Sequence, residues 1–278
     1  MLSIKKINSN DKNFSENLQK HISQRKFNTS DIKDKVKDII TEVRKNGDQA
    51  LIKFSSKYDN FSVDNAKDLE IPKEKFFEAV GKISKKELEA LKFAKMRIEE
   101  FASHQKSKSW DYTSEEIKLG EKITPINKVG IYVPGGSAVY PSSVLMNSVP
   151  AKVAGVKEII MVVPSPKGEV NDLVLAAAHL GGVDRLFRLG GAHAIAALAI
   201  GTNTIPKVNM IVGPGNQYVA EAKKELYGEV GIDSFAGPSE ILIIADSNAN
   251  ISWIVADLFS QAEHDILAQS ILISPDKD

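Results

Sequence analysis

From residue 129 onward, short aliphatic runs alternate with segments of helical length. The runs are VGIYV (129–133), EIIMVV (158–163), RLFRL (185–189) and VNMIV (208–212), and each leads into a turn containing Gly or Pro. Continuous apolar runs bounded by turn residues are typical of buried strands. The helix-like segments that follow are 142–155, 170–182, 193–202 and 216–228. This alternation predicts parallel strands joined by right-handed helical crossovers.

Two further apolar runs extend the pattern. EILIIAD (240–246) and SILIS (270–274) flank a helical pattern at 251–269. Strands and helices that alternate in this way predict an α/β protein with a doubly wound parallel sheet. In such sheets ligands usually bind beyond the carboxyl ends of the strands.

The first part of the chain is different in character. Residues 1–128 carry 48 of the 72 charged residues and 3 of the 18 glycines. Ser30 or Asp31 can cap a helix, and Gly47 stands where that helix is expected to end. The apolar face of the helix is Val36, Ile39, Ile40 and Val43. A helical N-terminal region is therefore predicted.

A second helix is predicted after Ser84. Ser84 and Glu87 have the spacing of a capping box, in which two side chains satisfy the first free backbone N–H groups of a helix. The apolar positions that follow are Leu88, Leu91, Ala94, Ile98 and Phe101. Their spacing predicts an amphipathic helix that packs these five residues on a larger unit, with the charged residues in solvent.

Composition narrows the classes of function. Lys plus Arg equals Asp plus Glu, 36 against 36, so no global field favours nucleic acid or anionic lipid. The absence of Cys excludes disulfides, thiolate metal sites and Cys nucleophiles within this sequence. The first residues lack the apolar core of a signal peptide, and no apolar run reaches roughly 18 residues. We therefore expect a cytoplasmic protein with small-molecule or protein partners.

The turns after the strands are the first candidate site. Glycine lets the backbone approach a ligand closely, and the following helix offers free N–H groups. The turn GPGNQY (213–218) has two glycines of a dinucleotide fingerprint, but Tyr218 stands where a third small residue is needed. The pattern by itself therefore leaves two readings open, a phosphate-binding turn and a tight connection between elements.

Two other segments contain candidate polar groups. Gln261 and His264 are three residues apart on a predicted helix, so both side chains project from one face and can reach one metal ion. A solvated polar pair is the alternative, since an amide oxygen is a weak metal ligand. Ser239, in AGPSE (236–240), either binds a ligand or closes a turn. No catalytic base is identified by pattern, because Ser-His-Asp and HExxH arrangements are absent from the sequence.

Taken in order, five segments closely resemble the histidinol dehydrogenase family. They are 129–146, 189–202, 212–224, 236–246 and 257–265. The resemblance implies a zinc-dependent homodimer that oxidises L-histidinol to L-histidine through histidinal. Two successive hydride transfers to NAD complete this last step of histidine biosynthesis.

The resemblance also implies roles for individual residues. Tyr132, His193 and Asn216 match NAD-contacting positions, although the family usually has Gln where His193 stands, and weaker NAD binding is expected from that change. Ser239 matches a substrate contact. The remaining two matches are Gln261 and His264, which are implied to bind both zinc and substrate. The zinc ion is expected to orient the substrate for hydride transfer.

The fold that the resemblance implies has two incomplete Rossmann-like units. Residues 1–25 form an N-terminal arm, residues 26–131 with 239–278 the first unit, and residues 132–238 the second. The family's catalytic Glu-His pair and its other zinc ligands lie beyond position 278, so residues 1–278 alone are expected to be inactive. Three alternatives stay open: a dehydrogenase for another polar primary alcohol such as a sulfonated diol, a non-catalytic ligand-binding module, and a structural protein.

Overall fold

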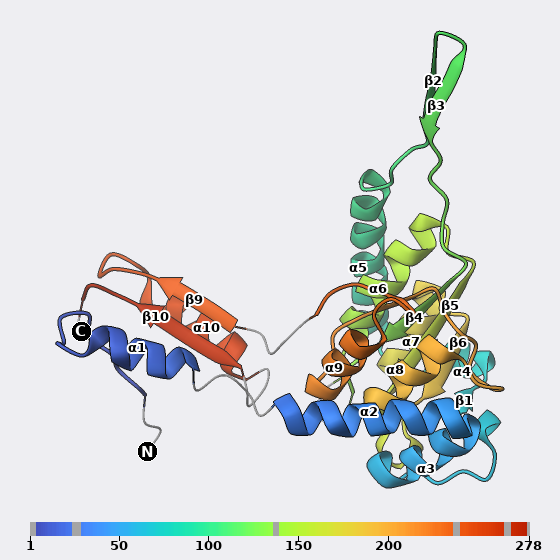
Figure 1. Ribbon diagram of the computed structural model, residues 1–278, viewed down its shortest axis with the longest axis horizontal. Helices are drawn as coiled ribbons and strands as arrows, with labels where there is room; N and C mark the ends of the chain where they lie inside the picture. The colour runs from blue at the N-terminus through green and yellow to red at the C-terminus, as the bar shows by residue number, and fades with distance from the viewer. Residues whose placement is uncertain (1–3, 24–28, 136–138, 236–239, 264–267, 277–278) are drawn as a thin grey trace.

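A six-stranded sheet forms the centre of the computed structural model, which describes residues 4–23, 29–135, 139–235, 240–263 and 268–276 (Figure 1). The order of the strands is β1-β6-β5-β4-β7-β8. Their bounds are β1 (Glu70–Ile71), β4 (Lys128–Tyr132), β5 (Glu158–Val163), β6 (Arg185–Arg188), β7 (Met210–Val212) and β8 (Gly231–Ile232). All neighbours are parallel except β1, which pairs antiparallel with β6. The predicted α/β class is confirmed.

The order of the strands reverses beside β4. The chain runs outward from β4 through β5 to β6, and then crosses back to place β7 on the other side of β4. The carboxyl ends of β4 and β7 therefore lie next to each other at a topological switch point, where doubly wound sheets bind ligands.

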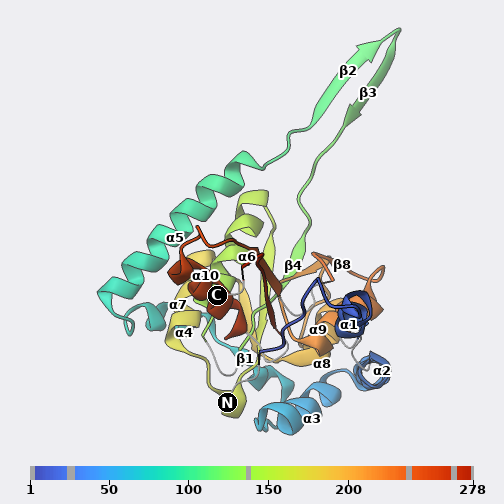
Figure 2. The same cartoon turned by 90° about the vertical axis from the view of Figure 1, so that its left-hand side faces the viewer.

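Helices cover both faces of this sheet (Figures 1 and 2). One layer contains α4 (Lys73–Val80), α5 (Lys85–His104), α6 (Pro141–Ala154) and α7 (Asp172–Gly181). The other contains α2 (Thr29–Asn46), α3 (Asp48–Asp59), α8 (Gly191–Ile200) and α9 (Gln217–Leu226). Within β5, Ile160 and Val162 face the second layer, whereas Ile159 and Met161 face the first. Burial on both faces explains why these strands read as continuous apolar runs.

The predicted N-terminal helices are present, but α2 already includes Thr29, so Ser30 and Asp31 lie inside the helix and do not cap it as predicted. Val36 and Val43 of α2 are buried, and Gly47 ends α2 and precedes α3 with a φ of 50°. At the start of α5 the capping box is confirmed: the backbone N of Glu87 donates to Ser84 Oγ at 3.2 Å, and the backbone N of Ser84 donates to Glu87 Oε2 at 2.8 Å.

The predicted apolar face of α5 is wrong at one position. Phe101 is 66% exposed, and Ala102 is buried in its place. The reason is geometric: the stripe that contacts the sheet layer continues through Leu91, Ala94, Ile98 and Ala102 at helical spacing, and Phe101 lies one residue to the side of it.

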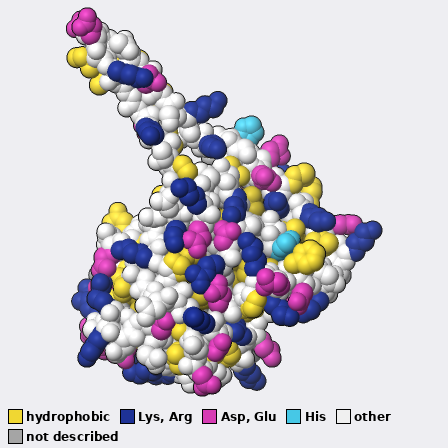
Figure 3. All heavy atoms as spheres, turned by 90° about the vertical axis from the view of Figure 1, so that its right-hand side faces the viewer, with side chains coloured by type: hydrophobic (Ala, Val, Ile, Leu, Met, Phe, Trp, Pro, Cys, Tyr) yellow, Lys and Arg dark blue, Asp and Glu magenta, His cyan; other side chains and the backbone are white. Residues whose placement is uncertain are grey.

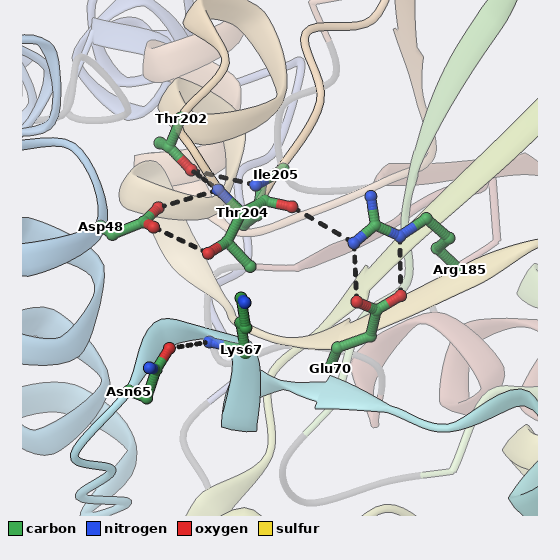
Figure 4. A network of polar contacts seen from close by, with 8 residues as sticks. All are labelled: Asp48, Asn65, Lys67, Glu70, Arg185, Thr202, Thr204 and Ile205. Carbon is green, nitrogen blue, oxygen red and sulfur yellow. Dashed lines mark hydrogen bonds and ion pairs between the residues drawn. The ribbon is translucent and has the colours of Figure 1, made fainter.

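Polar contacts fix the edge of the sheet (Figure 4). Arg185 on β6 donates two hydrogen bonds to the carboxylate of Glu70 on β1, at 2.7 and 2.6 Å. Nearby, Thr204 Oγ1 donates to Asp48 Oδ2 at 2.7 Å and ties the segment after α8 to the start of α3. Bidentate Arg–carboxylate pairs add geometric specificity, so the short strand β1 has a defined register.

A second, smaller sheet contains β9 (Glu240–Ile244) and β10 (Gln269–Ile273), which are parallel and are joined through α10 (Ile251–Ala262). The helix ends earlier than the predicted segment 251–269. Helix α1 (Phe14–Ser23) is linked to this sheet by a 2.8 Å contact between His21 Nε2 and Gln269 Nε2.

The predicted domain boundaries stay a prediction. In the described residues, β4 pairs with β5 and β7, and the helices of 29–104 pack on those of 141–226. Strands β9 and β10 pair with each other and not with the six-stranded sheet in the same part of the chain.

One described element has no counterpart in the expectations from sequence. Strands β2 (Trp110–Ser114) and β3 (Ile117–Glu121) form an antiparallel hairpin. In Figure 2 it extends away from the helical layers.

No described helix has both the length and the apolar character needed to cross a membrane.

Candidate functional site

Three segments meet at the carboxyl end of the central strands. The hydroxyl oxygen of Tyr132, the last residue of β4, accepts a hydrogen bond from the backbone N of Gly191 at 3.1 Å. In the turn after β7, a Cβ on Gly213 would lie 2.1 Å from the carbonyl oxygen of Tyr132. Gly213 also has a φ of +107°, which L side chains rarely adopt. The glycine therefore allows the β7 turn to lie directly against the end of β4.

The start of α8 has no side-chain cap. Its N-cap residue, Gly190, provides none, and its first turn contains no acidic residue. The backbone N of Gly191 donates to the Tyr132 hydroxyl, Gly190 is buried and Gly191 is partly buried. The positive end of the helix dipole favours a phosphate or carboxylate at such a position.

The start of α9 is arranged differently. Asn216 Oδ1 accepts hydrogen bonds from the backbone N of Tyr218 at 3.0 Å and of Val219 at 3.2 Å. Asn216 is exposed, and because its oxygen caps the helix, its amide N–H groups are the part that can donate to a ligand. Both helix starts lie at the switch-point edge of the sheet.

A buried lysine, paired with a more exposed aspartate, holds the β7 turn. Lys223 of α9 is 3% exposed, and its Nζ donates to the carbonyl oxygen of Gly213 at 2.6 Å and to Asp233 Oδ1 at 2.7 Å. The second oxygen of Asp233 accepts from the backbone N of Gly213 at 2.8 Å. Sequence reasoning missed this pair. The available signal was a Lys at helical spacing between the apolar Val219 and Leu226.

Tyr132 and His193 lie beneath the turns, and each is only 2% exposed. Burial raises the pKa of the Tyr132 hydroxyl to about 12 and lowers the pKa of the His193 imidazole to about 3. The imidazole ring lies 5.5 Å from that of Phe54 and 5.9 Å from that of Tyr58, and its Nε2 has no hydrogen-bond partner among the described residues. His193 is therefore neutral near pH 7. The NAD contacts of Tyr132, His193 and Asn216 stay a prediction.

Asp59, the last residue of α3, is a second buried polar group of this region. Its Oδ2 has no hydrogen-bond partner in the described part of the chain, and burial raises the pKa of its carboxyl group. The charge of Asp59 also contributes to the raised pKa of Tyr132, although burial is the larger cause. Sequence reasoning missed Asp59, because an Asp at the end of a helix looks like an ordinary turn residue.

The predicted substrate and metal positions are only partly described. Ser239 and His264 lie outside the described residues. Gln261 lies near the end of α10, and its Nε2 is buried without a partner among the described side chains. Within residues 4–23, 29–135, 139–235, 240–263 and 268–276, no group of three or more His, Asp or Glu side chains is arranged to hold a metal ion.

The fold defines the class of protein: a doubly wound, Rossmann-like α/β protein, in which ligands usually bind at the topological switch point. The sequence model of the family described as histidinol dehydrogenase matches residues 22–278. The chain belongs to this family, whose members are NAD-dependent oxidoreductases.

Individual proteins agree with the family match. The histidinol dehydrogenase of Methylococcus capsulatus is 53% identical over 274 residues, which are 98% of this chain and 63% of that protein. The enzyme of the same name from Hydrogenovibrio crunogenus is 49% identical over 279 residues, covering 100% and 64% of the two chains. A crystal structure of histidinol dehydrogenase from Elizabethkingia anophelis is similar with a TM-score of 0.79 and 37% identity, over 88% of this chain and 56% of that one. The chain thus spans less than two thirds of the length of these relatives.

Proposed function

We propose that this protein is an NAD-dependent dehydrogenase that oxidises L-histidinol to L-histidine by way of histidinal, as the last step of histidine biosynthesis. The observation that carries the proposal is the uncapped start of α8, at the carboxyl-end edge of the sheet, in a chain that belongs to the histidinol dehydrogenase family. The family match supports the substrate, and the uncapped helix start supports the dinucleotide.

NAD fits the described residues at this edge. The pyrophosphate of NAD binds at the start of α8, where the helix has no side-chain cap and no acidic residue in its first turn. Asn216 donates from its amide group to the same cofactor. Tyr132 and His193 form the floor beneath it, and the clamp of Lys223 and Asp233 holds the facing turn in place.

The reaction balances as two oxidations of one carbon. The reaction consumes one primary alcohol, two NAD⁺ and one water. It yields one carboxylate, two NADH and three protons. Each of the two NAD⁺ molecules, when bound, would accept one hydride. The residues of this chain bind the dinucleotide and hold the substrate beside it, and correct orientation is itself a large part of the rate of such a transfer.

The substrate, metal and partner assignments are also proposals. Ser239, Gln261 and His264 contact L-histidinol, and Gln261 and His264 bind Zn²⁺. The described residues do not assemble a metal site by themselves, and the metal assignment is supported by the family match. The unpartnered Nε2 of Gln261 is a hydrogen-bond donor and supports a contact with the substrate. The protein is proposed to act in the cytoplasm as a homodimer. Its units are the N-terminal arm 1–25, residues 26–131 with 239–278, and residues 132–238.

Calorimetric titration with NAD, together with measurement of NADH formation from several alcohols, tests the proposal. NAD is expected to bind, and the Asn216→Ala variant is expected to bind it at least about tenfold more weakly, as for loss of a hydrogen bond to a ligand. The full-length protein is expected to oxidise L-histidinol in preference to sulfonated diols, whereas residues 1–278 alone are expected to form little or no NADH. Absence of NAD binding, or preference for another alcohol, would overturn the proposal.

A matched control separates binding from helix stability. Asn171 caps α7 as Asn216 caps α9, with its side chain accepting from the backbone N of Leu173 at 2.8 Å. Replacing either Asn by Ala is expected to lower the unfolding free energy by about 1 kcal/mol. Only Asn216→Ala is expected to weaken NAD binding. An equal effect of both variants on affinity would contradict the assigned role of Asn216.

A further inference from the structure

Two buried polar groups of the smaller sheet are not used in the fold. The Nε2 atom of Gln261 and one of the two amide atoms of Gln269 are buried without a hydrogen-bond partner among the described residues. Buried polar groups are nearly always paired, so two such groups in one small unit indicate a missing partner. On the face of the molecule turned away from this sheet, basic and acidic side chains are interspersed (Figure 3). The buried amides, rather than that charged surface, therefore indicate a ligand.

Gln261 and Gln269 lie at the same end of the smaller sheet. Helix α10 connects two parallel strands, so its last turn returns to the amino ends of β9 and β10 (Figure 1). A hydrogen bond fixes this arrangement, since Ser270 Oγ donates to the carbonyl oxygen of Leu258 of α10 at 2.8 Å. Ser270 thus faces α10, and the preceding residue, Gln269, points to the other face of the sheet. A ligand at this end of the sheet can therefore contact one amide from each side.

The N-terminal segment determines which atom of the Gln269 amide is free. Lys5 Nζ lies 3.1 Å from Nδ1 of His21, and the amide of Gln269 lies 2.8 Å from Nε2 of the same ring. A lysine ammonium group only donates, so Nδ1 accepts and Nε2 carries the ring proton. Two N–H groups do not bond to each other. The amide therefore turns its carbonyl oxygen toward His21 and its NH₂ group toward the buried, unpartnered position, since the two orientations of an amide interchange these atoms.

Two free amide donors select a ligand with acceptor oxygens. An NH₂ group does not accept, so these donors do not bind the ammonium group of an amino alcohol. In the proposed reaction a carbon with one hydroxyl group becomes a carboxylate, which offers two charged oxygens. Hydrogen bonds to a charged acceptor are about twice as strong as those between neutral groups. The two amides therefore match the oxidised end of the ligand, and they match the product better than the alcohol.

We infer that Gln269 is a further substrate-binding residue, whose NH₂ group donates to the oxygens of the carbon being oxidised, together with the NH₂ group of Gln261. His21 is a positioning residue, because it holds the carbonyl oxygen of Gln269 and acts on the ligand only through that amide. The inference rests on the proposed function, since the ligands it concerns are L-histidinol and L-histidine.

Calorimetric titration of the full-length protein, with Zn²⁺ present, tests the inference by measuring the dissociation constants of L-histidine and L-histidinol. Gln269→Leu is expected to weaken the binding of L-histidine at least about tenfold and that of L-histidinol only about threefold. Gln269→Glu places a carboxylate beside that of the product, so it is expected to weaken L-histidine binding at least about a hundredfold. Retained binding of L-histidinol shows that both variants are folded.

Ser270→Ala is the matched control. It removes a hydrogen bond from the same strand, on the face toward α10, and is expected to leave the ratio of the two dissociation constants within about twofold of the parent value. Equal losses for the two ligands in Gln269→Leu, or no loss, overturn the inference but leave the proposed function standing. A full-length parent protein that binds neither ligand overturns both.

A double-mutant cycle tests the positioning role of His21. His21→Leu removes the donor that orients the amide, and is expected to weaken L-histidine binding about threefold in the full-length parent protein. In the Gln269→Leu background the same change is expected to have no further effect, within about 1.5-fold, because the oriented group is already absent. Equal losses in the two backgrounds would overturn the positioning role.

Discussion

The Nζ atom of Lys223 lies 2.6 Å from the carbonyl oxygen of Gly213, ten residues earlier in the chain and in the turn that faces the end of β4. Asp233 accepts from the backbone N of the same glycine, so both polar groups of Gly213 are held by one ion pair. Charge-assisted hydrogen bonds of this kind are stronger than neutral ones. The conformation of a turn in the proposed NAD site therefore depends on a buried lysine of the following helix.

Replacing Lys223 by Met is expected to destabilise the protein and weaken NAD binding. The substitution leaves the solvent-exposed Asp233 without its cation and the carbonyl of Gly213 without a donor, which costs about 1–3 kcal/mol of unfolding free energy. Denaturant unfolding and calorimetry measure the two effects. Lys224→Met is the control, because the Lys224 side chain is 57% exposed in its pair with Glu221. Equal stability of the two variants would contradict a structural role for the clamp.

Replacing Gly213 by Ala tests the close approach of the turn to β4. Gly213 and Gly228 have similar φ angles, +107° and +101°, but a Cβ on Gly228 meets nothing within 4 Å. Gly228→Ala therefore measures the backbone strain alone, about 1–2 kcal/mol. Gly213→Ala adds the clash with Tyr132 and is expected to lose at least about 2 kcal/mol more. Thermal unfolding of both variants decides the point, and a similar loss in each would exclude the clash.

The buried imidazole of His193 predicts a loss of stability in acid. Its pKa falls from 6.5 to about 3 on folding, so the unfolded chain binds a proton at a higher pH than the folded chain does. The stabilisation is complete above pH 6.5 and decreases as the pH falls toward 3, by on the order of 5 kcal/mol at most. His193→Gln removes this dependence and is also expected to increase NAD affinity.

Unfolding at several pH values, with the exposed His104→Gln as control, measures the effect. The His104 variant is expected to keep the pH dependence of the parent chain. A His193→Gln variant with an unchanged acid profile would contradict the assignment of the titrating group. One without any gain in NAD affinity would contradict the expected disadvantage of His at this position.

The buried carboxyl group of Asp59 is expected to make the stability of the protein depend on pH with the opposite sign. Burial raises the pKa of its carboxyl group, so the contribution to stability is most favourable in acid and is lost as the pH rises through the unfolded and then the folded pKa. Asp59→Asn is expected to raise the unfolding free energy at pH 7–8 by on the order of 1 kcal/mol. This gain is expected to vanish at low pH, where the parent carboxyl is protonated. The exposed Asp64→Asn is the control, and a constant gain at all pH values would contradict this explanation.

Local features of the fold could be predicted because they depend on neighbouring residues. The strand runs at 158–163 and 185–189 correspond to β5 and β6, and the capping box of Ser84 and Glu87 forms as its spacing predicts. The motifs also identify the family that the comparisons show. Within the candidate site, the glycine turn at 213–218 and the helix that follows it were predicted from short-range patterns, whereas the N-cap role of Asn216 was not.

Contacts between distant segments could not be predicted in the same way. The turn at Glu115 and Glu116 has φ angles of 47° and 68° but lacks the Asn-Gly signal of such hairpins. No local pattern therefore indicated the β2–β3 hairpin. Phe101 and Ala102 occupy adjacent helical positions, and only the direction in which α5 packs decides which is buried. The sequence by itself determined the alternation of elements, the capping box of Ser84 and Glu87, and the family. The tertiary structure alone decided which polar side chains are buried, Asp59, His193 and Lys223 among them, because desolvation depends on segments that pack from far along the chain.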